Sequence, residues 1–282
     1  SHRVAISIYL DIQNIYVTET EEKSHIYNYE FFLKRGLSIN LMEIGVSEYL
    51  NLTRNNYLAI IWPSADKKIK YLKYFNEIIY IKKIILNPTG AQNFVAEVYK
   101  NHEWVGDFEK GYNGAISKVN ETFKNYSYVH LILFKDKSFS NVIKTKDQLR
   151  KKFGIKKASI HITDNDDETA HLGKIILNQN SINFINKAIP YKFISTFNLL
   201  KDLKNHINKK QISLESFVLV GDIVLGVYGI KKTELVNYIS CFNLDNDLIF
   251  FKSSNAKIDL INQNIEELIY NPKYYFRFFD FK

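Results

Sequence analysis

The middle of the chain holds the pattern that most limits its fold: an apolar run, an amphipathic segment and a second apolar run in close succession. Residues 128–134 read Tyr-Val-His-Leu-Ile-Leu-Phe, which predicts a buried strand. Residues 142–153 carry apolar positions at helical spacing and stop before Gly154, a favoured residue after a helix C-terminus. Residues 159–163 predict another short strand. Strands that alternate with helices favour α/β or α+β layers over a bundle or a sandwich.

The same alternation extends over the rest of the chain. Further strands are expected at residues 4–10, 58–62, 78–81, 217–220, 236–242, 248–251 and 274–281. Helices are expected within residues 29–49, at 65–76, 91–100, 115–124, 168–177, 180–187, 196–209, 222–228 and 258–269, and a turn at 87–90. The predicted fold class is therefore α/β (α+β), with a mixed-sheet N-terminal domain followed by a smaller α+β domain.

The length favours two domains, because 282 residues exceed the usual size of one. Pro190 follows the last helix of the first block, so we expect domains at residues 1–190 and 191–282. The last predicted strand runs directly into Lys282 and is rich in Tyr and Phe. This ending indicates a fragment of a larger protein, truncated in its second domain.

The net charge narrows the choice of partners. There are 38 Lys and Arg against 30 Asp and Glu, giving +8, which points to an anionic partner such as nucleic acid, a nucleotide, an anionic sugar or a membrane surface. The 19 Tyr and 20 Phe are the aromatic residues that single-strand binders use. The basic residues, however, are mostly scattered Lys, and Arg, which suits bidentate base recognition, is scarce. Nucleic acid is therefore an unlikely partner, and an anionic sugar derivative or an acidic glycan is favoured.

The compartment follows from what the chain contains. Cys241 is the single cysteine, so no internal disulfide can form, which fits a reducing cytoplasm. We expect its thiol to be buried and inert. No apolar stretch reaches the roughly 18 residues that a membrane-spanning helix needs. These features predict a cytoplasmic protein without a transmembrane segment.

The richest cluster of reactive side chains surrounds His161, at the end of a predicted strand. An acidic turn follows with Asp164, Asp166, Asp167 and Glu168. A histidine there could accept a phosphoryl group or act as a base, and the carboxylates could hold Mg²⁺ in the N-terminal domain. The alternative is structural, because acidic residues at a helix N-terminus offset the helix dipole without any ligand.

This region resembles the active-site segment of nucleoside diphosphate kinases, in which a helix with Ile-Arg and Phe precedes a strand ending in His-Gly-Ser-Asp-Ser, with Glu and Ala on the next helix. The matching residues here are Leu149, Arg150, Phe153, His161, Asp164, Glu168 and Ala170. The resemblance implies that His161 accepts the phosphoryl group and that Arg150 contacts it, with Asp164 and Glu168 in the same site. The glycine after the histidine is replaced by Ile162, and Asn87-Pro88-Thr89 lacks the family's phosphate-binding lysine.

A second resemblance covers residues 214–282. The run Phe-Val-Leu-Val-Gly-Asp at 217–222, and Glu-Glu-Leu-Ile-Tyr-Asn-Pro at 266–272, resemble nucleotidyltransferase-like domains encoded with bacterial capsule and surface-polysaccharide genes. Those domains start with a strand and Gly-Ser at a helix N-terminus, and a later strand carries Asp-x-Asp for Mg²⁺. The resemblance implies that Gly221 and Asp222 contact a nucleotide. However, Asp222 replaces the serine, and Leu235-Val236-Asn237 replaces Asp-x-Asp, so we expect a degenerate domain.

A shorter candidate contains His102, Glu103, Trp104 and Gly106. Tryptophan stacks on sugar faces, so these residues could form part of a sugar-binding loop. The alternative is a buried tryptophan that anchors the loop.

Three functions remain open. The chain could be a transferase of bacterial capsule or surface-polysaccharide synthesis that acts on a phosphorylated or nucleotide-activated sugar. It could be a non-catalytic accessory module of a larger capsule glycosyltransferase. It could also bind nucleic acid, in which case affinity for single strands would fall steeply with salt.

Overall fold

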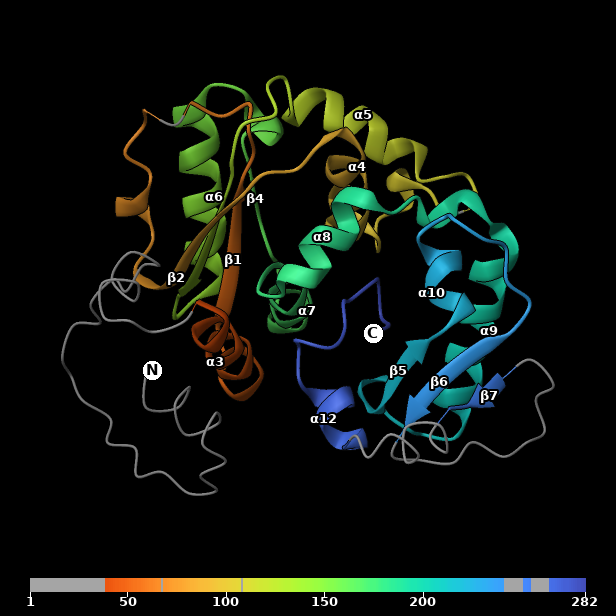
Figure 1. The fold of residues 1–282 in the computed structure, drawn as a ribbon. Helices are drawn as coiled ribbons and strands as arrows, with labels where there is room; N and C mark the ends of the chain where they lie inside the picture. The colour runs from red at the N-terminus through yellow and green to blue at the C-terminus, as the bar shows by residue number, and fades with distance from the viewer. Residues whose placement is uncertain (1–38, 67, 108, 241–250, 255–263) are drawn as a thin grey trace, which may run out of the picture. The chain divides into compact units, whose positions relative to one another are not determined.

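The chain forms two compact units, which a computed structural model describes over residues 39–66, 68–107, 109–240, 251–254 and 264–282 (Figure 1). The first unit comprises Ser1–Asn87 and Ser117–Leu177, and the second comprises Pro88–Ile116 and Asn178–Lys282. The segment Pro88–Ile116 thus groups with the C-terminal part of the chain. The expected single division near Pro190 stays a prediction about domains.

The first unit is built on a four-stranded sheet in the order β2-β3-β1-β4, and each neighbouring pair is antiparallel. Its strands are β1 (Asn56–Ile61), β2 (Glu77–Ile84), β3 (Val129–Lys135) and β4 (Ile160–Ile162). The helix α6 (Phe139–Phe153) joins β3 to β4, which run in the same direction on either side of β1. This connection is a split β-α-β unit.

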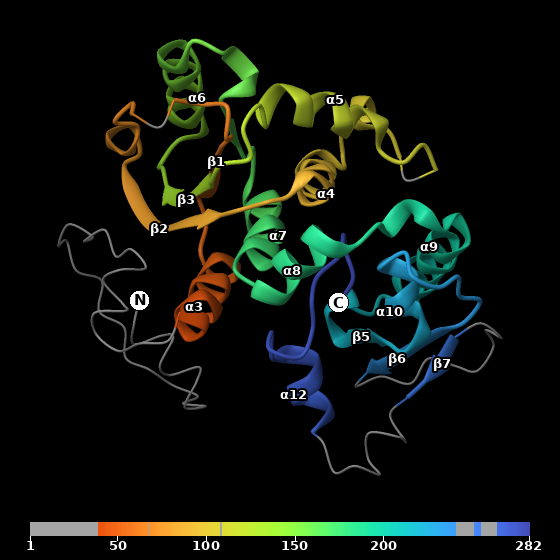
Figure 2. The same cartoon turned by 45° about the horizontal axis from the view of Figure 1, so that its top comes forward.

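The two faces of this sheet are covered by different helices, as Figures 1 and 2 show. The helix α6 buries Val142, Leu149 and Phe153 against one face, together with Ile160 and Ile162 of β4. The helices α3 (Ile39–Leu52) and α7 (Asp166–Ile176) pack against each other, and α7 contacts β1. Because side chains alternate along a strand, His161 points to the face opposite α6.

The second unit combines helices with a three-stranded sheet in the order β5-β6-β7. Its helices are α4 (Pro88–Tyr99), the start of α5 (Asn113–Thr122), α8 (Gln179–Lys187), α9 (Ile194–Lys209), α10 (Asp222–Val227) and α12 (Ile265–Tyr270). Its strands are β5 (Phe217–Val220), β6 (Val236–Ser240) and β7 (Phe251–Ser253), with β5–β6 antiparallel and β6–β7 parallel. Phe184 of α8 stacks on Phe276, with ring centroids 4.2 Å apart, and meets Phe278 edge-on.

The structure confirms the predicted α+β fold and most of its elements. The expected strands at 58–62, 78–81, 128–134, 159–163 and 217–220 and the expected helices at 91–100, 115–124, 142–153, 168–177, 180–187 and 196–209 are present within a few residues. Gly154 ends α6 in the left-handed conformation, with φ of 75°. The expected strand at 4–10, most of that at 248–251, the start of the helix at 258–269 and Cys241 lie outside the described residues.

Three local predictions are wrong, two of them where side chains pack against distant parts of the chain and one where a proline begins a helix. In place of the helix expected at 65–76, the described residues 65, 66 and 68–76 form turns and the short 3-10 helix Leu72–Tyr74. Phe75 is buried in the α6 face of the sheet, and the Asp66 side chain accepts the N–H of Lys68. The expected turn at 87–90 is the start of α4, because Pro88 suits the first helical position. The expected strand at 274–281 forms only the bridge between Phe278 and Phe281, since its aromatic rings pack against helices.

Candidate functional site

The side chain of His161 is held inside the junction between β4 and α7. In β4, His161 pairs with Ile60 of β1. Only 7% of its side chain is exposed, and its Nε2 lies 3.1 Å from Oε1 of Glu168 in α7. The strand therefore places the imidazole directly beside a carboxylate in a packed interior; the catalytic role expected for these two residues stays a prediction.

In the acidic turn that follows β4, side-chain oxygen atoms accept hydrogen bonds from backbone N–H groups around the start of α7. The Asn165 side chain accepts the N–H of Glu168, while Oε2 of Glu168 accepts the N–H of Asp164 at 2.7 Å. This reciprocal arrangement satisfies donors that a helix N-terminus otherwise leaves unpaired. The carboxylate of Asp166 accepts the N–H groups of Asn55 and Asn56, which ties the loop before β1 to the same turn.

These bonds bear on the expectation of Mg²⁺ in this region. The oxygens of Asp166 and Glu168 accept backbone N–H groups, and Oδ1 of Asp164 lies 2.9 Å from Nζ of Lys146. Within the described ranges, no group of three or more His, Cys, Asp and Glu side chains is arranged to hold a metal ion. The chemistry available at this junction is thus that of a histidine paired with a carboxylate.

Burial sets the protonation state of the imidazole. Removal from water lowers the pKa of His161 below its ordinary value of 6.5, and this effect exceeds the opposing contribution of the hydrogen bond that Glu168 accepts from the imidazole. His161 is consequently neutral at pH 7. A neutral imidazole retains a lone pair for base or nucleophile chemistry, but its surroundings must open before a substrate reaches it.

Arg150 is not part of this cluster. It lies on α6, which covers the opposite face of the sheet, and its guanidinium NH1 is 3.8 Å from Oδ1 of Asp147 one turn earlier. Lys146, one turn before Arg150, reaches the acidic turn instead. The sequence carries one signal for Lys146: its position four residues before Arg150 places both side chains on one side of the helix.

Gly221 and Asp222 occupy the predicted strand-to-helix turn at the end of β5. Gly221 has a φ of 72°, which favours glycine, and Asp222 opens the six-residue helix α10. The Asp222 carboxylate lies 2.7 Å from Nζ of Lys231. A Cβ added to Gly221 would lie 3.1 Å from the side-chain nitrogen of Asn237 in β6. The turn thus faces an amide where the resembled family has a carboxylate.

The short 3-10 helix Glu103–Val105 carries Trp104, whose side chain is 49% exposed. The alternative of a buried tryptophan that anchors this loop is therefore wrong. Val105 is fully buried and supplies the anchor instead. The Trp104 ring contacts Tyr99 at a centroid distance of 5.0 Å and His102 at 6.3 Å.

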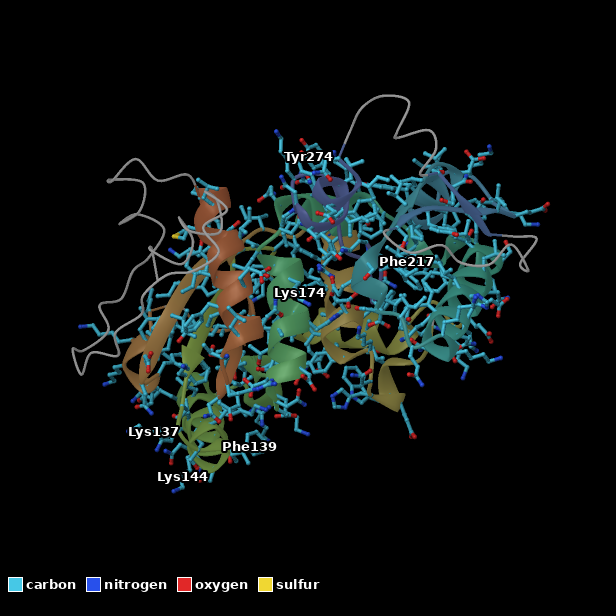
Figure 3. All side chains as sticks on the ribbon, turned by 90° about the horizontal axis from the view of Figure 1, so that it is seen from below. Lys137, Phe139, Lys144, Lys174, Phe217 and Tyr274 are labelled. Atoms are coloured by element: carbon cyan, nitrogen blue, oxygen red, sulfur yellow. The ribbon has the colours of Figure 1, made fainter. Side chains whose placement is uncertain are left out.

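The start of α6 is a basic surface with an exposed aromatic side chain. Lys137, Phe139 and Lys144 lie at the same end of the first unit (Figure 3), and all three side chains are exposed. Asp147 is exposed on the same helix, and Asp136 hydrogen-bonds at its start. Carboxylates lie among these lysines, so they do not form a continuous positive surface along α6. The expectation that the partner is not a nucleic acid stays a prediction.

Comparisons of the chain with protein-family models, with curated proteins and with solved structures found no match. Among the described residues, the helices are all too short or too polar to cross a bilayer. The arrangement of the side chains around His161, Gly221 and Trp104 is therefore what bears on the function.

Proposed function

We propose that the chain is a non-catalytic, glycan-binding accessory module of bacterial surface-polysaccharide synthesis, which serves a separate glycosyltransferase. The observation that carries this proposal is the position of the Asn237 side chain beside Gly221, where an added Cβ would lie 3.1 Å from the amide nitrogen of Asn237. Metal-assisted attack on an α-phosphate relies on paired carboxylates to hold Mg²⁺, whereas Leu235-Val236-Asn237 offers a single neutral amide and no carboxylate. The ion pair of Asp222 with Lys231 further supports a turn used for structure.

The test combines a turnover assay with a binding assay on the full chain. With Mg²⁺, nucleoside triphosphates or nucleotide-sugars, and oligosaccharide acceptors, we expect no release of pyrophosphate or nucleotide. In native electrophoresis we expect the chain to migrate more slowly through a gel that contains dextran or mannan than through a gel without polysaccharide. Mg²⁺-dependent turnover that Asp222→Asn abolishes would contradict the proposal, and so would equal migration in all gels.

A second candidate is a transferase that works on a phosphorylated or nucleotide-activated sugar. The 3.1 Å contact between His161 and Glu168 favours it, since a carboxylate that orients an imidazole is a recurring arrangement for nucleophilic catalysis. In the first step, an N–P bond to the imidazole would form as the P–O bond to the γ-phosphoryl group of a nucleoside triphosphate donor breaks and the nucleoside diphosphate leaves; the phosphoryl group would then pass from the imidazole to a sugar hydroxyl or sugar phosphate. An acid-labile label from γ-³²P-ATP that is lost in His161→Gln would support this candidate, and an unlabelled wild-type chain would contradict it.

A further inference from the structure

Trp104 combines wide exposure of its side chain with a firmly fixed backbone. A Cβ added to Gly114, at the start of α5, would lie 2.0 Å from the carbonyl oxygen of Trp104 and 2.8 Å from Cα of Val105. Only glycine permits this approach, so the backbone of Trp104 packs directly against the start of the helix. The N–H of Val105 donates to the carbonyl of His102, and that of Gly106 donates to the carbonyl of Glu103.

The ring itself is held from the side. Tyr99, at the end of α4, is nearly buried and meets the indole at an interplanar angle of 56°. His102 meets Tyr99 edge-on, with centroids 5.7 Å apart, and completes a trio of rings. These contacts orient Trp104 before any ligand arrives, which reduces the entropy lost on binding. An exposed aromatic side chain with a fixed orientation is a better ligand platform than a mobile one.

The groups beside the ring are polar. Asn101, His102, Glu103 and Asp107 are all exposed within three residues of Trp104. They supply amide, imidazole and carboxylate groups that can exchange hydrogen bonds with hydroxyls. An apolar ring flanked by such groups suits a pyranose, whose C–H face packs on the indole while its hydroxyls meet the polar rim.

The charge of this loop selects among sugars. Glu103, Asp107 and Glu109 are exposed and acidic. Lys110 lies 4.0 Å from Asp107, while Lys100 is engaged by Asp280 at 2.9 Å. An acidic glycan would therefore meet like charge here, despite the net charge of +8 of the whole chain. Carboxylates also form strong hydrogen bonds with neutral hydroxyl donors.

We infer that Trp104, with His102 and Glu103, forms a binding platform for a neutral hexopyranose unit. This inference deepens the proposed function, on which it rests for its biological setting, by naming the ligand class and the residues that recognise it. It also revises the earlier expectation of an acidic glycan, at least for this surface.

The chain offers a direct probe, because it contains two tryptophans with opposite environments. Trp62 is fully buried, whereas Trp104 is half exposed. Acrylamide should therefore quench mainly the emission of Trp104, with Trp62 as an internal reference. We expect maltohexaose, cellohexaose or mannohexaose at millimolar concentration to reduce this quenching at least twofold. A hexasaccharide of hyaluronan, which carries uronates, should give at least tenfold weaker protection.

Matched variants assign the effect to this ring. Trp104→Phe should keep the fold, lose the quenchable emission and weaken binding of the neutral hexasaccharide in calorimetry. Trp104→Ala should weaken it at least tenfold. Tyr128→Ala is the control, because Tyr128 is also 49% exposed but lies in the first unit, and its affinity should equal that of the wild type.

Three results would overturn the inference: no protection by any neutral hexasaccharide, unchanged affinity in Trp104→Ala, or tighter binding of the uronate sugar. Protection of Trp104 only by self-association of the chain, measured by sedimentation, would replace the sugar with a second copy and also overturn it. If dextran or mannan slows migration but Trp104 is not shielded, this platform is excluded while the proposed function stands. Mg²⁺-dependent turnover together with protection of Trp104 by a neutral hexasaccharide would contradict the proposed function and leave the platform standing.

Discussion

The β4–α7 junction around His161 and the loop around Trp104 make opposite use of their functional groups. At the junction, a histidine and three carboxylates have polar partners within the first unit, and the imidazole is buried. In the loop, the backbone is fixed by Val105 and Gly114 while the aromatic and polar side chains face solvent. The residues with the more reactive side chains therefore lie in the buried junction. The Trp104 loop, whose side chains are exposed, is the better candidate for ligand binding.

The first way to test this contrast is to remove the imidazole. His161→Ala leaves a cavity and an unpaired Glu168 oxygen in a packed junction, so we expect a loss of about 2–4 kcal/mol in the free energy of unfolding. Urea denaturation followed by circular dichroism measures it. His161→Gln, which can still donate to Glu168, should lose less than the alanine variant. A loss below about 0.5 kcal/mol in His161→Ala would mean that the junction is open.

The second test uses pH. The pKa of His161 is lowered by burial, so the unfolded chain binds this proton at about pH 6.5, before the folded chain does. Above pH 6.5 both states are neutral, and stability falls as the pH drops from 6.5 toward the lower pKa of the folded state. The wild type should lose up to about 1.4 kcal/mol per pH unit more than His161→Gln in this window. Parallel curves for the two proteins would contradict a buried neutral imidazole.

The smallest expected effect concerns the stability of the Trp104 loop. Trp104→Ala removes a half-exposed ring that contacts Tyr99 and His102, so we expect a loss of about 1 kcal/mol or less in the free energy of unfolding. The same urea denaturation measures it, and Trp62 still reports unfolding by fluorescence. A loss as large as that of His161→Ala would show that the ring serves the fold and would remove the contrast between the two regions.

The fold was largely predictable because its main elements have strong local patterns. The runs at Tyr128–Phe134 and Phe217–Val220 are apolar and short, and Gly154 marks the end of α6. The prediction failed where packing against residues far away in the sequence determines the local structure. Phe75 is buried in the core beside the sheet, within a segment whose pattern had predicted a helix, and Phe276 of the C-terminal segment stacks on Phe184 of α8. At the candidate sites, the resemblance grouped His161 with Glu168, but nothing in the sequence indicated that the two side chains pair in a packed interior, that Arg150 faces away or that Trp104 is exposed.

The insertion of Pro88–Ile116 between β2 and β3 has a consequence for how the chain can be made. The helix α4 packs on α8, which is synthesised only after the whole sheet of the first unit. A Cβ added to Gly90 of α4 would lie 2.2 Å from the side-chain oxygen of Asn186 in α8 and 3.2 Å from its Cα, so the two helices pack closely there. During synthesis on the ribosome, the face of α4 that packs on α8 therefore stays without its partner until α8 has emerged. Apolar surfaces exposed in this way promote misassociation of nascent chains. No single cut after Leu177 yields two fragments that each keep all the contacts of one unit.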